Sequence, residues 1–198
     1  LLYLSAKLIH LRQPGIDVGT INSMILVIDI GSGTTDVCVV KGGKLVSSSM
    51  NTIVFGGRNV QNKVAKALRS DPKIGGDYPE DVVANVVATG KLAIRKNLVF
   101  DVSDLVRKAK EEVAESINQG IVQYLEDSNF ATNQIAYLLP VGGGAIRNEG
   151  IEPLSQYVCN NVLKSCHAEI LPIPGGVSPR DLNVLGASMV VSGSGKKN

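Results

Sequence analysis

The patterned part of the chain begins with three short apolar runs that predict β-strands. They lie at about residues 25–30, 36–41 and 44–51, and Gly42 and Gly43 between the last two indicate a hairpin. The first run is almost continuously apolar, so we expect it to form a buried strand.

Apolar residues at helical spacing follow the third strand. One helix is predicted at about 58–69. A second starts near Pro79, with two acidic residues in its first turn, and is interrupted at Gly90. The clearest helix runs from about 101 to 125. The buried faces of the first and third helices are expected to consist of Val60, Val64 and Leu68, and of Leu105, Ala109, Val113, Ile117 and Ile121.

The rest of the chain alternates between the two patterns. A short strand is predicted at about 97–102, a strand at 135–141, a helix at about 148–164, a strand at 169–173 and a helix from Pro179. The order is therefore β-β-β-α, an insert, and then α-β-α-β-α, which predicts an α/β fold.

Composition narrows the classes of function. The 198 residues are 44% apolar, enough for a sizeable core, and the net charge of +2 is too small to indicate a nucleic-acid or membrane surface. There is no Trp and aromatic residues make up 4%, which argues against a stacking platform for bases. No apolar run approaches the roughly 18 residues of a membrane-spanning helix.

The cysteines and histidines form no recognisable metal or disulfide pattern. Cys38, Cys159 and Cys166 are odd in number and lack CxxC spacing, so we expect buried thiols in a reducing cytoplasm. His10 and His167 have no partner at the spacing of metal ligands, and we expect each to be a structural or surface residue.

The most informative segment joins the first two strands and reads Asp29-Ile-Gly-Ser-Gly-Thr-Thr-Asp36. A Rossmann or P-loop motif predicts a helix directly after the glycines. Here residues 36–40 are strand-like, and no Lys follows a glycine in the turn. The segment therefore predicts a β-turn-β cradle whose backbone N–H groups and hydroxyls bind phosphate.

This segment resembles the second phosphate motif of the actin-like ATPase superfamily, which includes actin, bacterial filament proteins of the MreB, ParM and FtsA types, heat-shock chaperones and sugar kinases. Its Gly-Thr-Thr-Asp ending is most similar to the bacterial and plasmid filament branch. Three further stretches follow in the family's order. Residues 55–59 resemble its Gly-Gly turn, residues 139–147 its adenosine motif, and residues 183–188 its final helix.

The resemblance implies a ribonuclease-H-like half-domain of the actin fold, in which helices flank a mixed sheet and a small subdomain is inserted. Residues 1–24 would be a linking helix and loop from a first domain, residues 25–69 and 101–193 the nucleotide-binding domain, residues 70–100 the insert and residues 194–198 a flexible tail. Because relatives have two phosphate hairpins and this chain has one, it is expected to be the second half of such a protein.

The resemblance also implies roles for individual residues. Asp29 would hold Mg²⁺ through bound water, and Asp36 would orient the attacking water. Gly56 and Gly57 would let a helix start near the nucleotide. The phosphates would lie on Gly31, Ser32, Gly33, Thr34 and Thr35, and the adenosine and α-phosphate on Gly142, Gly143 and Gly144, with Ile146 or Arg147 near the base.

Other charged residues are assigned to the surface. Lys91 and Arg95 lie where relatives place a Glu and Lys pair around the ribose, but the Glu is missing, so a solvated basic face is expected. The long helix is expected to present a solvent face with i,i+4 pairs, formed by Lys108, Lys110, Glu111, Glu112 and Glu115.

The function implied by the resemblance is that of an ATPase that binds ATP and Mg²⁺ between two domains and self-associates into filaments. It would serve DNA segregation, cell shape or the cytoskeleton, with an adaptor or cargo protein as partner, and without direct nucleic-acid binding or a membrane span. A chaperone or reactivating factor, a sugar or acid kinase, and an interaction module without catalysis stay open as alternatives. So does the choice between ATP and GTP, and this half alone is expected to bind nucleotide weakly.

Overall fold

The computed structural model describes most of the chain from Ser23 onward. The described residues are 23–42, 44–95, 97–148, 150–173, 177–182, 184–185 and 188. The linking helix and loop predicted for residues 1–24 lie almost entirely outside them, as do His10 and the predicted tail. The helix predicted after Pro179 lies partly outside them.

The centre of the fold is a five-stranded mixed sheet in the order β3-β2-β1-β6-β7. β1 (Met24–Ile30) pairs antiparallel with β2 (Thr35–Lys41), which pairs antiparallel with β3 (Lys44–Ile53). On its other side β1 runs parallel to β6 (Ile135–Val141), and β6 runs parallel to the short β7 (Glu169–Ile170). β1 is therefore the middle strand, which explains its continuous apolar sequence.

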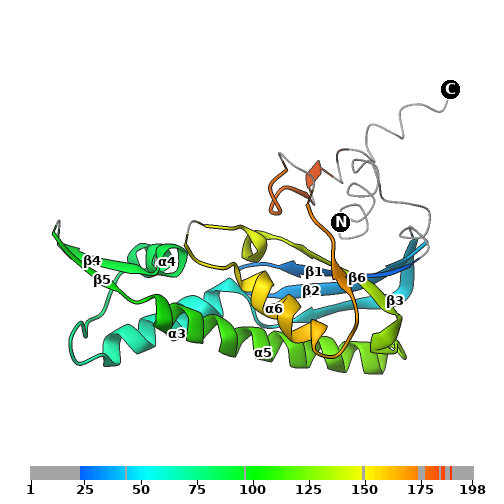
Figure 1. Ribbon diagram of the computed structural model, residues 1–198, viewed down its shortest axis with the longest axis horizontal. Coiled ribbons are helices and arrows are strands. Elements are labelled where there is room, and N and C mark those ends of the chain that lie inside the picture. Colours follow the sequence, from blue (N-terminus) through cyan, green and yellow to red (C-terminus); the bar gives the residue numbers. More distant parts are fainter. Residues whose placement is uncertain are drawn as a thin grey trace.

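Three helices cover one face of the sheet (Figure 1). They are α3 (Gly57–Ser70), α5 (Ser103–Asp127) and α6 (Leu154–Leu163). Their apolar sides and the sheet residues beneath them form the larger core of the molecule. The predicted apolar face of α3 is fully buried. The predicted stripe of α5 is buried from Ala109 onward, whereas Leu105 is partly exposed.

The opposite face of the sheet carries a smaller core. Alternate residues of β1, β2 and β6 form it together with Leu171 and Leu182. Since side chains alternate along a strand, Asp29 and Asp36 lie on this same face, directly beyond its apolar part.

A small unit lies at one end of the molecule, beyond the five-stranded sheet (Figure 1). It consists of α4 (Glu80–Thr89) and a hairpin of β4 (Lys91–Arg95) and β5 (Leu98–Asp101). Gly90 ends α4 in the left-handed conformation, with φ of +68°, and its N–H donates to the backbone O of Val86 at 2.7 Å. The predicted interruption at Gly90 is thus confirmed. Buried residues of this unit belong to the larger core, so it packs onto the main body.

Some predicted elements differ from the structure. The helix predicted at about 148–164 begins only at Leu154, because Asn148 and Ile151 form an antiparallel bridge and Pro153 stands before the helix. The strand predicted at 169–173 ends at Ile170. The strand predicted at 97–102 is one arm of a hairpin. The other arm is β4, which the apolar pattern does not predict.

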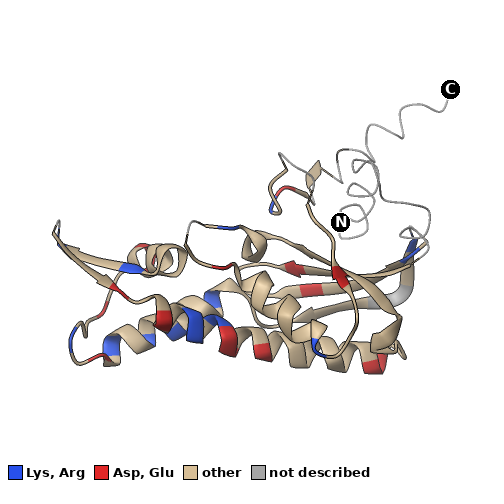
Figure 2. Ribbon diagram, in the orientation of Figure 1, with Lys and Arg blue, Asp and Glu red and all other residues tan. Residues whose placement is uncertain are grey.

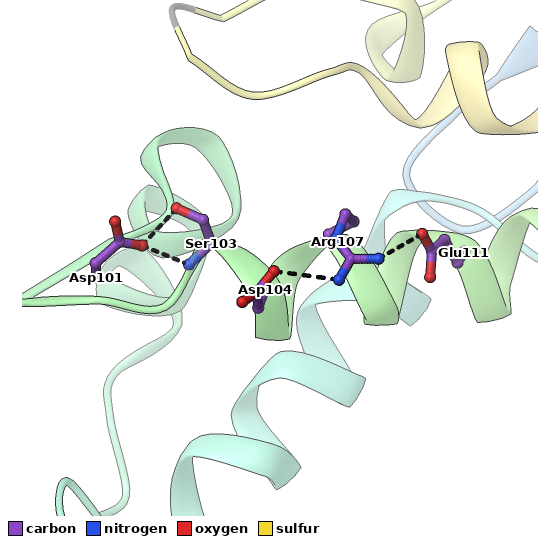
Figure 3. A network of polar contacts seen from close by, with 5 residues as sticks. All are labelled: Asp101, Ser103, Asp104, Arg107 and Glu111. Atoms are coloured by element: carbon purple, nitrogen blue, oxygen red, sulfur yellow. Dashed lines mark hydrogen bonds and ion pairs between the residues drawn. The ribbon is translucent and has the colours of Figure 1, made fainter.

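Charged residues are frequent along α3 and α5 (Figure 2). Lys63 of α3 pairs with Glu112 of α5 at 2.6 Å. Arg107 lies between Asp104, at 3.1 Å, and Glu111, at 2.9 Å (Figure 3). The solvent face predicted for α5 is therefore confirmed for Lys108, Glu111, Glu112 and Glu115, which are all exposed. Exposed pairs of this kind stabilise a fold only slightly.

The three cysteines are buried thiols, as predicted. Burial raises the pKa of Cys38 and of Cys159 to about 12, so both stay protonated. Among the described residues, no helix is both long enough and apolar enough to cross a bilayer.

Candidate functional site

The turn between β1 and β2 is a tight hairpin. Gly31 N–H donates to the backbone O of Thr34 at 2.9 Å, which leaves Ser32 and Gly33 exposed at the tip. Within the described part of the chain, the amides of Ser32, Gly33 and Thr34 form no hydrogen bond. The predicted β-turn-β hairpin is therefore present, and its tip carries amides without an acceptor in the described part of the chain. Phosphate binding by these amides stays a prediction.

The start of α3 packs directly on this hairpin. Gly57 N–H donates to the backbone O of Gly31 at 3.0 Å, and Arg58 N–H donates to that of Ser32 at 2.6 Å. A Cβ at Gly56 would approach these two carbonyl oxygens to 2.7 and 2.8 Å, closer than real Cβ atoms come. The first amides of α3 therefore hold the hairpin in place, and Gly56 is required for the close approach.

Thr35, which was predicted to contribute to the phosphate cradle, has a buried side chain. Its side chain is fully buried, and its hydroxyl donates to the backbone O of Phe55 at 2.8 Å. The hydroxyl therefore ties the start of β2 to the segment before α3, and its proton is used within the protein. Thr34, by contrast, is partly exposed on the turn.

Asp29 and Asp36 are direct partners across β1 and β2. Antiparallel partners share one face of a sheet, with Cβ atoms about 4.5–5.5 Å apart. Thr52, the next partner across on β3, donates its hydroxyl to Oδ1 of Asp36 at 2.5 Å. Two neighbouring carboxylates on one face provide the hard oxygen ligands that Mg²⁺ prefers.

The second Gly-rich turn follows β6 and lies against Asp29. Gly142 has φ of +83°, and a Cβ there would overlap Oδ1 of Asp29. Gly142 N–H donates to the backbone O of Pro179 at 3.1 Å. The predicted helix does not follow directly, because residues 143–145 form a single 3₁₀ turn (η2, Gly143–Ala145). In the described part of the chain, the amides of Gly143 and Gly144 form no hydrogen bond.

One pocket of about 410 Å³ joins the two Gly-rich turns. Its wall also includes one side of α3 and α4, Lys110 of α5 and Arg180. Four residues between β6 and the first turn of α6 complete it, namely Ile146, Asn148, Pro153 and Leu154. The predicted site residues that line it are Gly31, Ser32, Gly57, Gly143, Gly144 and Ile146.

The remaining predicted residues lie outside this wall. Asp29 lies against Gly142, and Gly33 and Thr34 complete the hairpin tip. Arg147 is exposed and does not line the pocket, whereas Arg180 does. Lys91 and Arg95 are exposed on β4, which agrees with the solvated basic face predicted for them.

Lys110 corrects the prediction of a solvent face. It is only 5% exposed and lines the pocket, and its Nζ donates to the backbone O of Glu152 at 2.7 Å. Its place between Lys108 and Glu111 suggests an exposed charge. One feature of the sequence does indicate that Lys110 is buried. It follows Ala109 and stands three residues before Val113, and both of these residues belong to the apolar stripe of the helix.

Comparison with protein families gives one match. Residues 27–149, more than half of the chain, match the family described as archaeal actin homologue MreB-like, C-terminal. A comparison with curated proteins finds no match.

Solved structures with the same fold include actin homologues from several sources. Ta0583, an archaeal actin homologue, has a TM-score of 0.69 at 19% identity over 98% of this chain and 52% of its own. MreB5 of Spiroplasma citri bound to AMPPNP has a TM-score of 0.65 at 17% identity over 98% and 59%. A ParM filament from Clostridium botulinum has a TM-score of 0.63 at 19% identity over 87% and 46%.

The chain therefore spans about half the length of these proteins, and such low identities establish the fold alone. That fold is the predicted actin-type half-domain, a mixed sheet flanked by helices. With the family match over residues 27–149, the chain belongs to the MreB-like archaeal actin homologues, and it corresponds to their C-terminal half.

Proposed function

We propose that this chain is the nucleotide-binding half of an actin-like protein that binds and hydrolyses ATP with Mg²⁺ and assembles into filaments. The observation that carries the proposal is the pocket that joins the hairpin turn after β1 to the Gly-rich turn after β6. The division into residues 25–69 and 101–193 around an insert at 70–100 belongs to the same proposal.

The pocket suits a ligand with a phosphate chain at one end and an apolar ring at the other. Backbone N–H groups bind phosphate oxygens without adding a counter-charge. Those without a partner in the described part of the chain belong to Ser32, Gly33, Thr34, Gly143 and Gly144. Apolar contacts for a base and ribose come from Val60, Ala84, Val87, Ala88, Ile146 and Leu154.

The two neighbouring carboxylates fit a magnesium ion beside the phosphates. Gly142 lets the turn after β6 approach Asp29 closely, because a Cβ at this position would overlap the carboxylate. Asp29 would hold the ion through water, since Mg²⁺ keeps several of its waters. When bound, Mg²⁺ would neutralise charge on the β- and γ-phosphates.

Asp36 is the residue proposed to orient the attacking water. The hydroxyl of Thr52 holds Oδ1 of Asp36 and so fixes the orientation of the carboxylate. Its other oxygen can then accept a hydrogen bond from a water. Phosphoryl transfer requires mainly positioning and charge stabilisation, so one oriented carboxylate is a sufficient contribution from this half.

Filament assembly is proposed from the relatives. One structure of similar fold is a ParM filament, and another is MreB5 with AMPPNP bound. By analogy, the first supports filament assembly and the second supports nucleotide binding. A cytoplasmic location, an adaptor or cargo protein, and roles in DNA segregation or cell shape follow the same analogy.

The test is light scattering on the protein expressed from the complete gene, with ATP and Mg²⁺. We expect scattering to rise on addition of ATP and to decay as phosphate is released, and to stay flat when EDTA replaces Mg²⁺. If the scattering stays flat while the protein still hydrolyses ATP, the filament proposal is wrong and the chaperone or kinase alternatives are favoured. Absence of both nucleotide binding and hydrolysis would overturn the proposal altogether.

A further inference from the structure

Lys110 is a buried charge in the wall of the proposed nucleotide pocket. With 5% of its surface exposed, it is the most deeply buried Lys, Arg, Asp or Glu among the described residues. Its Nζ donates to the backbone O of Glu152 at 2.7 Å. In the described part of the chain, no carboxylate lies within 4.0 Å of this ammonium.

The protein therefore satisfies the ammonium only in part. An ammonium has three N–H donors, and the contact with Glu152 uses one of them. Burial of a cation without a full set of partners is costly, and this desolvation lowers the pKa of Lys110 to about 8. A hydrogen-bond acceptor on a ligand in the pocket would supply a partner for the remaining N–H donors of Lys110.

No neighbouring charge in the described part of the chain takes up the remaining donors of Lys110. The Glu152 carboxylate attracts the ammonium but lies beyond ion-pair distance, so it raises the pKa of Lys110 by less than burial lowers it. Arg107 and Glu111, on the same helix, bind each other at 2.9 Å (Figure 3). Arg180 is the other charged residue of the pocket wall, and it is a cation that cannot accept a hydrogen bond. A group that accepts from Lys110 is thus expected from the ligand.

Lys110 lies on the apolar side of the pocket. Its contact with the backbone of Glu152 places Nζ beside Pro153 and Leu154, which line the pocket together with Ala84 and Ala88 of α4. The amides proposed to bind phosphates come from the Gly-rich turns instead. A base between these apolar residues would present its polar edge to Lys110.

We propose that Lys110 contacts the base of the nucleotide and makes this site accept GTP as well as ATP, with the larger gain for GTP. Guanine presents two adjacent acceptors, O6 and N7, on one edge. Adenine presents N7 beside an amino group on the same edge. The Lys110 ammonium has donors only, so it can bind N7 but cannot pair with that amino group. The inference rests on the proposed function, since it assigns a residue of the same pocket.

The test is the affinity of the protein from the complete gene for ATP and GTP with Mg²⁺, measured by isothermal titration calorimetry. Lys110→Met keeps the length of the side chain and removes its charge. Lys108→Met is the matched control, because Lys108 lies on the same helix, is exposed and does not line this pocket. Thermal unfolding of each variant checks that it is folded, and removal of an unpaired buried charge is expected to preserve folding.

We expect Lys110→Met to weaken GTP binding about tenfold or more and ATP binding by less, as for the loss of a charged hydrogen bond. Lys108→Met is expected to change neither affinity. If a folded Lys110→Met variant binds both nucleotides as the wild type does, or if the wild type binds ATP and not GTP, the assignment of Lys110 is wrong while the proposed function stands. If the wild type binds neither nucleotide, the proposed function itself fails.

Discussion

Oδ1 of Asp29 occupies the position that a side chain at Gly142 would need. The two residues come from the ends of adjacent parallel strands, β1 and β6, and Gly142 has φ of +83°. A Cβ is therefore excluded both by the carboxylate and by the backbone conformation. This contact places the turn after β6 against the end of β1, and it connects the two halves of the proposed nucleotide site.

Gly142→Ala is expected to destabilise the protein by about 1–3 kcal/mol, because it forces a left-handed alanine and displaces Asp29. It should also weaken nucleotide binding. Urea unfolding measures the first effect and calorimetry the second. Gly143→Ala is the matched control, since a Cβ there meets no atom within 4 Å. Equal stability of the two variants would show that the Asp29 contact does not hold the turn.

Thr35→Val should lower stability by about 1–3 kcal/mol, because Val has the same shape but leaves the backbone O of Phe55 without its donor. Thr34→Val, one residue earlier and partly exposed, should change stability by less than about 0.5 kcal/mol. Urea unfolding of both variants makes the comparison. A stability loss confined to Thr34→Val would contradict the structural role given to Thr35.

Asp36→Asn should slow ATP hydrolysis about a hundredfold, the usual size of a proton-accepting or water-orienting contribution. Nucleotide affinity should change little, because Asn keeps the oxygen that accepts from Thr52. Phosphate release and calorimetry on the protein from the complete gene separate the two effects. Thr52→Val, which removes only the hydroxyl, should give a smaller loss of rate. Full activity of Asp36→Asn would remove Asp36 from the proposed mechanism.

The sequence predicts best those elements whose pattern is local. The hairpin of β1 and β2 and the helices α3 and α5 follow from apolar spacing over their own residues. The β-bridge between Asn148 and Ile151, which delays α6, depends on a loop conformation that no periodicity encodes. The small β4 escapes prediction because four of its five residues are exposed.

Two site residues show why motif resemblance and local pattern can mislead. Thr35 belongs to the phosphate motif, yet it shares a strand face with the buried Val37 and Val39, so strand alternation already placed it inward. Lys110 lies in a charged stretch, and its burial depends on the segment around Glu152, which is 42 residues away in sequence. Tertiary packing of that kind is not visible in a local window.

The pH dependence of stability offers a separate measure of the state of Lys110. Burial lowers its pKa from 10.5 to about 8, so between these pH values the unfolded chain holds more protons than the folded one. Stability should therefore rise as the pH increases through 8. Cys38 and Cys159 act in the opposite sense, because burial raises their pKa from 9.0 to about 12 and so lowers stability above pH 9.

The informative quantity is therefore the difference between the wild type and Lys110→Met in the absence of nucleotide, measured by urea unfolding at pH 7 and pH 9. We expect the wild type to gain about 1 kcal/mol relative to the variant over this interval. The difference cancels the contributions that both proteins share, such as those of Cys38 and Cys159. The charged groups that face Lys110 are Glu152, whose carboxylate acts on its pKa, and Arg180, which lines the same pocket. An unchanged difference would mean that the ammonium is fully solvated or paired in the folded protein. Lys110 would then have no unmet donor to offer a base.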